Sequence, residues 1–144
     1  MQSKEQTKLT YIAGRWTELS AKIAALVAEL PDDKVDWTPS AGVRSYGSVL
    51  RHMAFWNRYV AATLRAQPAE DQANELPNQK YGTKTLALDA FNSASSDVVD
   101  AMDTASRTEL IEVVLPFLEH NAEHYGQLSV YARLLSIVPP ASRG

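Results

Sequence analysis

Apolar residues recur every three or four positions along four stretches of this chain, and segments containing proline and glycine separate these stretches. The first stripe lies in residues 4–30 and consists of Leu9, Ile12, Trp16, Leu19, Ile23, Leu26 and Leu30. Spacing of this kind places the residues on one face of an α-helix. Pro31 and the two aspartates that follow it end this first predicted helix.

Two further helices are predicted in the middle of the chain. Ser45 can cap a helix that extends to about residue 65, and another helix extends from about residue 83 to residue 102. The connecting residues 31–44 and 66–82 contain prolines and a glycine and lack helical spacing. We therefore interpret both connections as loops.

A fourth helix is predicted to begin after residues 106–109, Ser-Arg-Thr-Glu, which fit a capping box. It should run to about Ile137, because Pro139 and Pro140 follow. Pro116 lies inside this stretch and has no N–H to donate. We expect either a kink one turn before His120 or a late helix start at Pro116.

Four amphipathic helices favour an all-α protein, specifically a four-helix bundle, formed as a single domain over residues 1–144. The shorter connections should join antiparallel neighbours. The connection 66–82, about 17 residues, is long enough to cross the bundle, so the second and third helices could run in the same direction.

Charge and composition exclude several classes of function. The formal net charge is -3 and no run of lysine or arginine occurs, so we expect no nucleic-acid partner. The chain has no cysteine, which excludes disulfides, metal–thiolate sites and a thiol nucleophile of its own. The first residues are polar and do not resemble a signal peptide, and no apolar run approaches the roughly 20 residues of a membrane span. We therefore expect a cytoplasmic protein without membrane contacts.

The three histidines of the chain, His52, His120 and His124, are candidate metal ligands. His120 and His124 are four residues apart on the fourth predicted helix and should project from nearly one face. His52 interrupts an otherwise apolar stripe on the second helix. Three imidazoles with an open position are typical of catalytic zinc sites, and nitrogen ligands also suit nickel, copper and iron. Core histidines without a metal, or a metal that only ties helices together, remain alternatives.

Four other residues are candidates for the surroundings of this site. Glu123 is the carboxylate beside the histidine pair and is weighed as a general base, although it points about 100° away from the second histidine. Gln127 shares a face with the pair and could bind a ligand or orient a histidine. Tyr131 and Trp56 could line a substrate pocket, and packing in the core is the alternative for each.

Three further expectations concern the neighbourhood of the pair. HNAEH fits the H-x-x-E-H motif of inverzincin proteases, but residues 125–144 contain no Asp or Glu to serve as a distant ligand, which argues against that class. Gly126 is isolated in a helix, where glycine costs about 1 kcal/mol against alanine, so we expect another helix to approach closely there. The loop 31–44 should rim the pocket, with Trp37 as part of a lid.

The motifs described above resemble those of the DinB-like family. The run FLEHNAEHYGQLSVYARLLSIVPPAS resembles the C-terminal helix of that family, in which H-x-x-x-H is followed by Tyr or Arg, Gly and Gln. The run RSYGSVLRHMAFWNRYV resembles the second helix, which supplies the remaining histidine, and WTPSAGVRSYGS resembles the loop before it. The resemblance implies an up-down-down-up bundle and a metal site formed by His52, His120 and His124, usually with zinc or nickel.

The resemblance also implies a homodimer. Some members of the family are thiol-dependent S-transferases acting with bacillithiol or mycothiol, a related branch contains a maleylpyruvate isomerase, and many members have no known activity. We therefore expect a divalent-metal protein. Its candidate activities are transfer of a low-molecular-weight thiol cosubstrate to a small molecule, or hydrolysis of a small-molecule substrate. A non-catalytic, dimeric metal-binding or structural module is the alternative.

Overall fold

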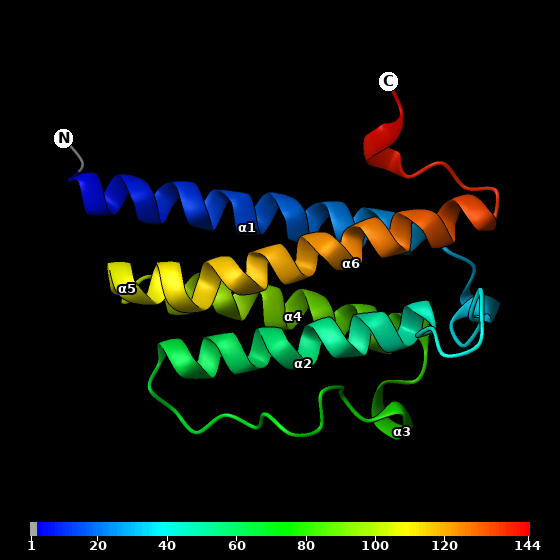
Figure 1. The fold of residues 1–144 in the computed structure, drawn as a ribbon, viewed down its shortest axis with the longest axis horizontal. Helices are drawn as coiled ribbons and strands as arrows, with labels where there is room; N and C mark the ends of the chain where they lie inside the picture. Colours follow the sequence, from blue (N-terminus) through cyan, green and yellow to red (C-terminus); the bar gives the residue numbers. More distant parts are fainter. Residues whose placement is uncertain (1–2) are drawn as a thin grey trace.

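The computed structural model describes residues 3–144, and this range is helical with no strand. The long helices, which lie side by side in Figure 1, are α1 (Lys4–Glu29), α2 (Tyr46–Leu64), α4 (Lys84–Met102) and α6 (Leu115–Leu134). The short elements are η1 (Asp32–Lys34), α3 (Asn78–Tyr81), α5 (Arg107–Glu109), the π-helical turn η2 (Leu110–Val114) and η3 (Pro140–Ser142). The predicted all-helical bundle is confirmed, and α3 is an element that the sequence analysis did not predict.

The connection between α2 and α4 determines how the helices are arranged. In Figure 1, α1 and α6 run toward the same end of the bundle, and α2 and α4 run the opposite way. The chain between α2 and α4 returns along the length of α2 and carries α3 before α4 begins (Figure 1). As a result, this segment lies beside α2 and can contact residues along it.

Side-chain caps explain where the helices begin. The Ser45 side chain accepts a hydrogen bond from the Ser48 N–H at 3.1 Å, and Thr83 caps α4 in the same way. Ser106 and Glu109 form the predicted capping box, in which each side chain accepts from the other residue's N–H. A cap of this kind satisfies N–H groups that have no partner inside the helix.

The end of α6 differs from the prediction, because the helix stops at Leu134 rather than at about Ile137. Ser136 has a φ of 64°, in the left-handed region. The N–H of Ile137 donates to the Ala132 carbonyl at 2.8 Å, and the N–H of Ser136 donates to the Arg133 carbonyl at 3.0 Å. This pair of bonds is a Schellman ending, which satisfies the last carbonyls and turns the chain away.

The irregularity expected at Pro116 takes the form of the π turn η2. The N–H of Leu115 donates to the carbonyl of Leu110, five residues earlier, so the turn before the proline is wider than an α-helical turn. Pro116 then lies in the first turn of α6, where a missing N–H costs little. Helical structure therefore begins at Arg107, as the capping box predicts, while the regular α-helix starts next to the proline.

The core has two parts, and buried Asn57 lies between them along α2. The Asn57 side chain donates to Ser95 Oγ on α4 at 3.1 Å and accepts from Asn121 Nδ2 on α6 at 3.0 Å. The largest fully buried side chains on either side include Trp16, Ile23, Leu26, Tyr46, Leu50, Met53, Phe91, Met102 and Leu128. Burial of each such side chain stabilises the fold by about 1.5–3 kcal/mol. The hydrogen bonds of Asn57 join α2 to α4 and α6.

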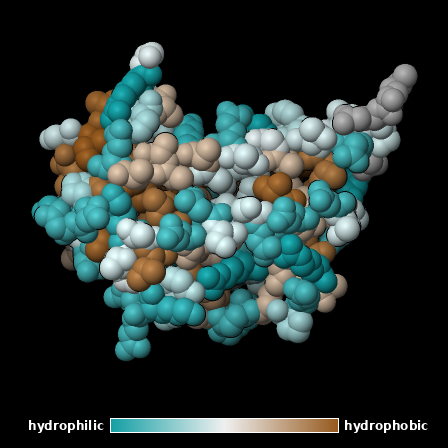
Figure 2. Space-filling view, turned by 180° about the vertical axis from the view of Figure 1, so that it is seen from behind, coloured by the Kyte–Doolittle hydropathy of each residue, from teal (hydrophilic) through white to brown (hydrophobic). Residues whose placement is uncertain are grey.

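The surface is mixed in character. Figure 2 shows the back of the bundle as mostly hydrophilic or neutral residues with small, separate hydrophobic groups. The large exposed hydrophobic residues are Tyr11, Leu86, Ile111, Val130, Leu134 and Val138. Among residues 3–144, no helix combines the length and the apolar character needed to cross a membrane.

Candidate metal centre

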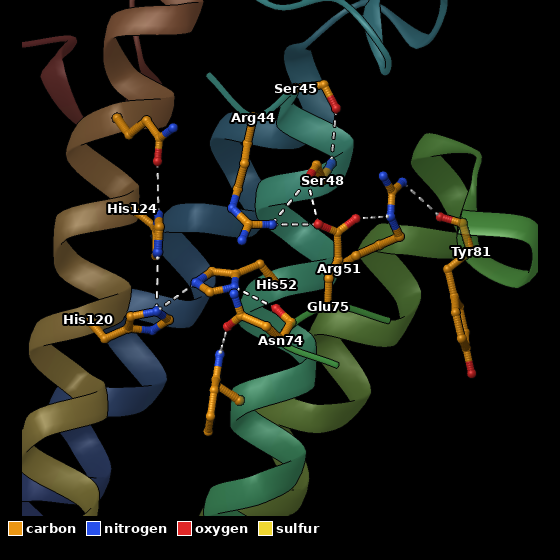
Figure 3. Close-up of polar contacts among 12 residues, drawn as sticks. Arg44, Ser45, Ser48, Arg51, His52, Asn74, Glu75, Tyr81, His120 and His124 are labelled. Atoms are coloured by element: carbon orange, nitrogen blue, oxygen red, sulfur yellow. Dashed lines mark hydrogen bonds and ion pairs between the residues drawn. The ribbon is translucent and has the colours of Figure 1, made fainter. Parts of the chain in front are cut away.

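The structure brings His52 of α2 together with His120 and His124 of α6 (Figure 3). The Nε2 atom of His120 lies 3.0 Å from Nε2 of His52 and 3.2 Å from Nε2 of His124. One nitrogen from each ring lies within 4.8 Å of the other two. His52 is buried, whereas the two histidines of α6 are half-buried. The predicted projection of the α6 pair from one face is therefore observed, and packing of α2 against α6 supplies the third imidazole.

A loop carbonyl determines the tautomer of His52. Its Nδ1 lies 2.7 Å from the carbonyl oxygen of Asn74, which can only accept, so Nδ1 carries the proton. Asn74 has a φ of 63°, and its side-chain oxygen accepts from Trp56 Nε1–H at 2.7 Å. Asparagine is among the residues that tolerate this left-handed conformation. The lone pair of His52 Nε2 is consequently directed toward the other two histidines.

A relay of hydrogen bonds determines the orientation of His124. Its Nδ1–H donates to Gln127 Oε1 at 2.9 Å, and Gln127 Nε2–H donates to the hydroxyl oxygen of Tyr131 at 2.7 Å. The Tyr131 hydroxyl then donates to the Arg44 carbonyl at 2.6 Å. Gln127 thus contacts a histidine, as one of its two sequence interpretations required. Tyr131 is buried and anchors this relay, so its hydroxyl is occupied.

The outer contacts of His120 are the weakest of the three, although the Asn121 side chain lies close enough to raise its pKa. Its Nδ1 is buried and has no hydrogen-bond partner among the described residues. Its Nε2 faces two nitrogens whose lone pairs point at it, since the other two rings carry their protons on Nδ1. Without a metal, one proton on His120 Nε2 is the only donor available to the Nε2 lone pairs of His52 and His124. A metal cation in place of that proton could accept the lone pairs of all three Nε2 atoms.

The arrangement fits a divalent metal ion. With zinc–nitrogen bonds of about 2.0–2.1 Å and tetrahedral angles, two ligand nitrogens lie about 3.3 Å apart. The distances of 3.0 and 3.2 Å around His120 are close to this value. Three imidazoles could hold a divalent metal ion, and their nitrogens alone do not select among zinc, nickel, copper and iron.

Burial favours the neutral form of His52 and His120. Removal from water is the largest cause that lowers the pKa of His52 and lowers the pKa of His120 to about 4. The next contribution for His120 is the positive charge that His124 would carry, because like charges disfavour each other. At neutral pH the lone pairs of both rings are therefore available to a metal without competition from protons.

The other predicted site residues lie in different surroundings. Glu123 is exposed, and within residues 3–144 no hydrogen bond or ion pair joins it to the histidines. Trp56 is half-buried, and its ring stacks on Phe117 with centroids 5.5 Å apart. The Phe117 ring lies edge-on to His120 at 5.7 Å. Trp56 and Phe117 thus form an apolar wall beside one histidine.

Two further expectations concerned Gly126 and the loop 31–44. The close helix approach predicted at Gly126 is wrong, because a Cβ added there would meet nothing within 4 Å and the residue is exposed. Trp37 of the loop 31–44 packs edge-on against Tyr131, with centroids 6.1 Å apart. The loop therefore contacts the hydrogen-bond relay of His124, and its last residue, Arg44, is close enough to His52 and His120 to lower the pKa of each.

Sequence analysis missed the charged cluster next to His52. The Glu75 carboxylate accepts from Arg44 Nη1 at 2.5 Å, from Ser48 Oγ at 2.6 Å and from Arg51 Nε at 3.0 Å (Figure 3). Arg51 is buried. The signal in the sequence that could have revealed this cluster is Arg51, a charged residue next to His52 among apolar residues of the helix. Its partner, Glu75, lies in a loop without periodicity and could not be identified from spacing.

The chain was compared with models of protein families and with curated proteins. The model of a protein family described as the DinB superfamily matches residues 15–132. No curated protein matches the chain.

Proposed function

The chain belongs to the DinB superfamily, and on this basis we propose that it is a metal-dependent S-transferase acting on a small molecule. The observation that carries the proposal is the convergence of three Nε2 atoms, two of them with lone pairs aimed inward by bonds at Nδ1. His52, His120 and His124 would hold the ion. When bound, a divalent cation supplies Lewis acidity, which lowers the pKa of a thiol or a water molecule that reaches it.

An open position supports catalysis over a purely structural role. A structural zinc site is closed by four protein ligands, whereas a catalytic site keeps one position free. Three nitrogens converge here with no fourth residue in the group, and His120 and His124 keep partial contact with solvent.

The surroundings favour a thiol over water as the nucleophile. Within the described residues no carboxylate is bonded to the three histidines, and the nearby Glu75 is already engaged by two arginines. A site without a general base suits a nucleophile that ionises easily, and a free thiol has a pKa of about 8.5 against about 15.7 for water. Since the chain has no cysteine, the thiol comes from solution.

The proposed step is a substitution at an electrophilic carbon. The thiol proton passes to solvent, a sulfur–carbon bond forms, and the leaving group departs with its electron pair. The stacked rings of Trp56 and Phe117 offer an apolar surface for the electrophile next to His120. We place this activity in the cytoplasm, where small thiols are kept reduced.

Turnover measurements on protein loaded with zinc or nickel test the proposal. Bacillithiol, mycothiol or a simple alkyl thiol is combined with an aryl halide, and thioether formation is followed. We expect product that requires both metal and thiol and is lost in His124→Ala. Ester hydrolysis without any thiol would show the hydrolase instead. Tight metal binding with neither activity would show a non-catalytic module, and a protein that binds neither metal would refute the proposal.

A further inference from the structure

The part of the α2–α4 connection that lies beside His52 is anchored to α2 through three consecutive residues, Asn74, Glu75 and Leu76. The Asn74 carbonyl accepts from His52 Nδ1–H at 2.7 Å. The Leu76 N–H donates to the Arg51 carbonyl at 3.3 Å, and the Leu76 side chain is buried in the core. The Asn74 carbonyl is therefore the contact of this 74–76 segment with the candidate metal centre, and its position depends on how the segment is held.

Glu75 is the charged anchor of the segment. Arg51 is 3% exposed, and the Glu75 carboxylate 3.0 Å away is its partner of opposite charge. Arg44 approaches the same carboxylate from the start of α2 (Figure 3). A buried cation that loses its counter-charge is strongly destabilised, so this carboxylate is held in place from two sides.

Packing alone does not hold the connection in place. A hollow of about 280 Å³ lies between the connection and α2, lined by Phe55, Tyr59, Pro68 and Leu76 among others. Trp56 reaches across to the Asn74 side chain with one hydrogen bond. Because side chains do not fill this hollow, we infer that the hydrogen bonds and ion pairs of Asn74 and Glu75 determine where the Asn74 carbonyl lies.

We propose that the 74–76 segment is a positioning element for the metal centre, with Glu75 as its principal residue. By pairing with Arg51 and Arg44, Glu75 holds the Asn74 carbonyl against His52 Nδ1–H. That bond keeps the proton off Nε2 and aims the Nε2 lone pair at the site. Outer partners of this kind commonly change metal affinity by about 10–100-fold. The inference rests on the proposed metal centre.

Glu75→Gln tests the inference, because it keeps the side-chain size and removes the charge. In metal-free protein at pH 7.5, nitrogen-15 NMR of the imidazoles reports which nitrogen of each histidine carries the proton. We expect His52 to change from a single Nδ1–H tautomer to a mixture, while His124, held through Gln127, keeps its signal. The Kd for Co²⁺ and Zn²⁺, from competition with a chelating dye, should rise about 10–100-fold.

Glu29→Gln is the matched control, since it removes a carboxylate from another arginine pair, with Arg143 of the C-terminal segment. It should leave both the His52 tautomer and the Kd unchanged. Asn74→Gly is a second variant that keeps the left-handed backbone and removes only the bond from Trp56, so it remains informative if Glu75→Gln fails to fold. We expect a smaller change in the same direction.

The outcomes separate the inference from the proposed function. An unchanged His52 tautomer in the folded variants would overturn the inference, even with a weaker Kd, because the segment would then act only through stability. If the unsubstituted protein bound neither Co²⁺ nor Zn²⁺, the proposed function would fail. The tautomer comparison in metal-free protein would still decide whether the 74–76 segment controls His52.

Discussion

His120 is the residue at which the metal-free and metal-loaded proteins should differ most. Its buried Nδ1 lacks a partner, and its Nε2 lies 3.0 and 3.2 Å from two other imidazole nitrogens. In the unsubstituted protein the unpaired Nδ1 destabilises the native state by about 1–3 kcal/mol, and His120→Leu relieves this cost. The same substitution removes the shared hydrogen bond at Nε2, which stabilises the native state by about 0.5–1.5 kcal/mol. These effects oppose each other, so the free energy of unfolding of the metal-free variant should lie between about 0.5 kcal/mol below and about 2.5 kcal/mol above that of the unsubstituted protein.

Zinc should then separate the two proteins. An ion that binds only the native state at 100 times its Kd adds about 2.7 kcal/mol to the free energy of unfolding. For a chain of this length, that corresponds to a rise of roughly 5–11 °C in the thermal midpoint. The unsubstituted protein should show this gain. His120→Leu should show little of it, because the remaining imidazoles, one on each helix, leave the coordination shell half empty.

Urea unfolding followed by circular dichroism, with zinc and then with excess chelator, measures both quantities. Glu29→Gln serves as a control that should gain as much from zinc as the unsubstituted protein, since its ion pair with Arg143 is exposed. Equal zinc stabilisation of His120→Leu and the unsubstituted protein would refute the reasoning, because His120 would then not be a ligand. So would a loss of several kcal/mol in the metal-free variant, because His120 would then be a core residue satisfied in its apo state.

Four other outcomes are expected. The metal-free protein should lose stability as the pH falls from 6.5 toward about 4, because the lowered pKa of His120 lets the unfolded chain take up a proton before the native state does; a flat urea midpoint across this range would contradict this. Gln127→Leu, which removes the acceptor for His124 Nδ1–H, should weaken zinc binding about 10–100-fold in a dye competition, and an unchanged Kd would count against the relay. Asn57→Ala should reduce the free energy of unfolding by about 2–4 kcal/mol, since two buried partners lose a hydrogen bond; urea titration measures it, and a loss below 1 kcal/mol would show that water replaces the amide. Light scattering should give twice the chain mass of 15.9 kDa for the homodimer implied by the family resemblance, and a value near one chain would exclude it.

The candidate site shows where reasoning from sequence stops. The projection of His120 and His124 from one face followed from their spacing, and the same spacing suggested that Gln127 could orient a histidine. Glu123 looked eligible as a base because it is adjacent in sequence, yet it is exposed. The carboxylate that the structure brings next to the site, Glu75, follows a loop asparagine that no periodic pattern marks.

The glycine and proline of the fourth helix show a second limit. Gly126 was expected to mark close packing, but it lies on the exposed face, where a larger residue would also fit. Pro116 was correctly identified as an irregular point, because its missing N–H is a local property. The sequence did not show which irregularity would form. The structure has a π turn over residues 110–114, and a wider turn of this kind depends on how the surrounding helices pack.

The sequence by itself determined the long helices, their caps and the shared face of His120 and His124, because these depend on residues within four positions of one another. The family resemblance implied that His52 joins that pair, and the tertiary structure brings the three rings together; it alone decided that the Asn74 carbonyl sets the His52 tautomer. Those contacts join residues 68 and 22 positions apart, respectively. They exist only because the α2–α4 connection returns along α2 and α2 packs against α6.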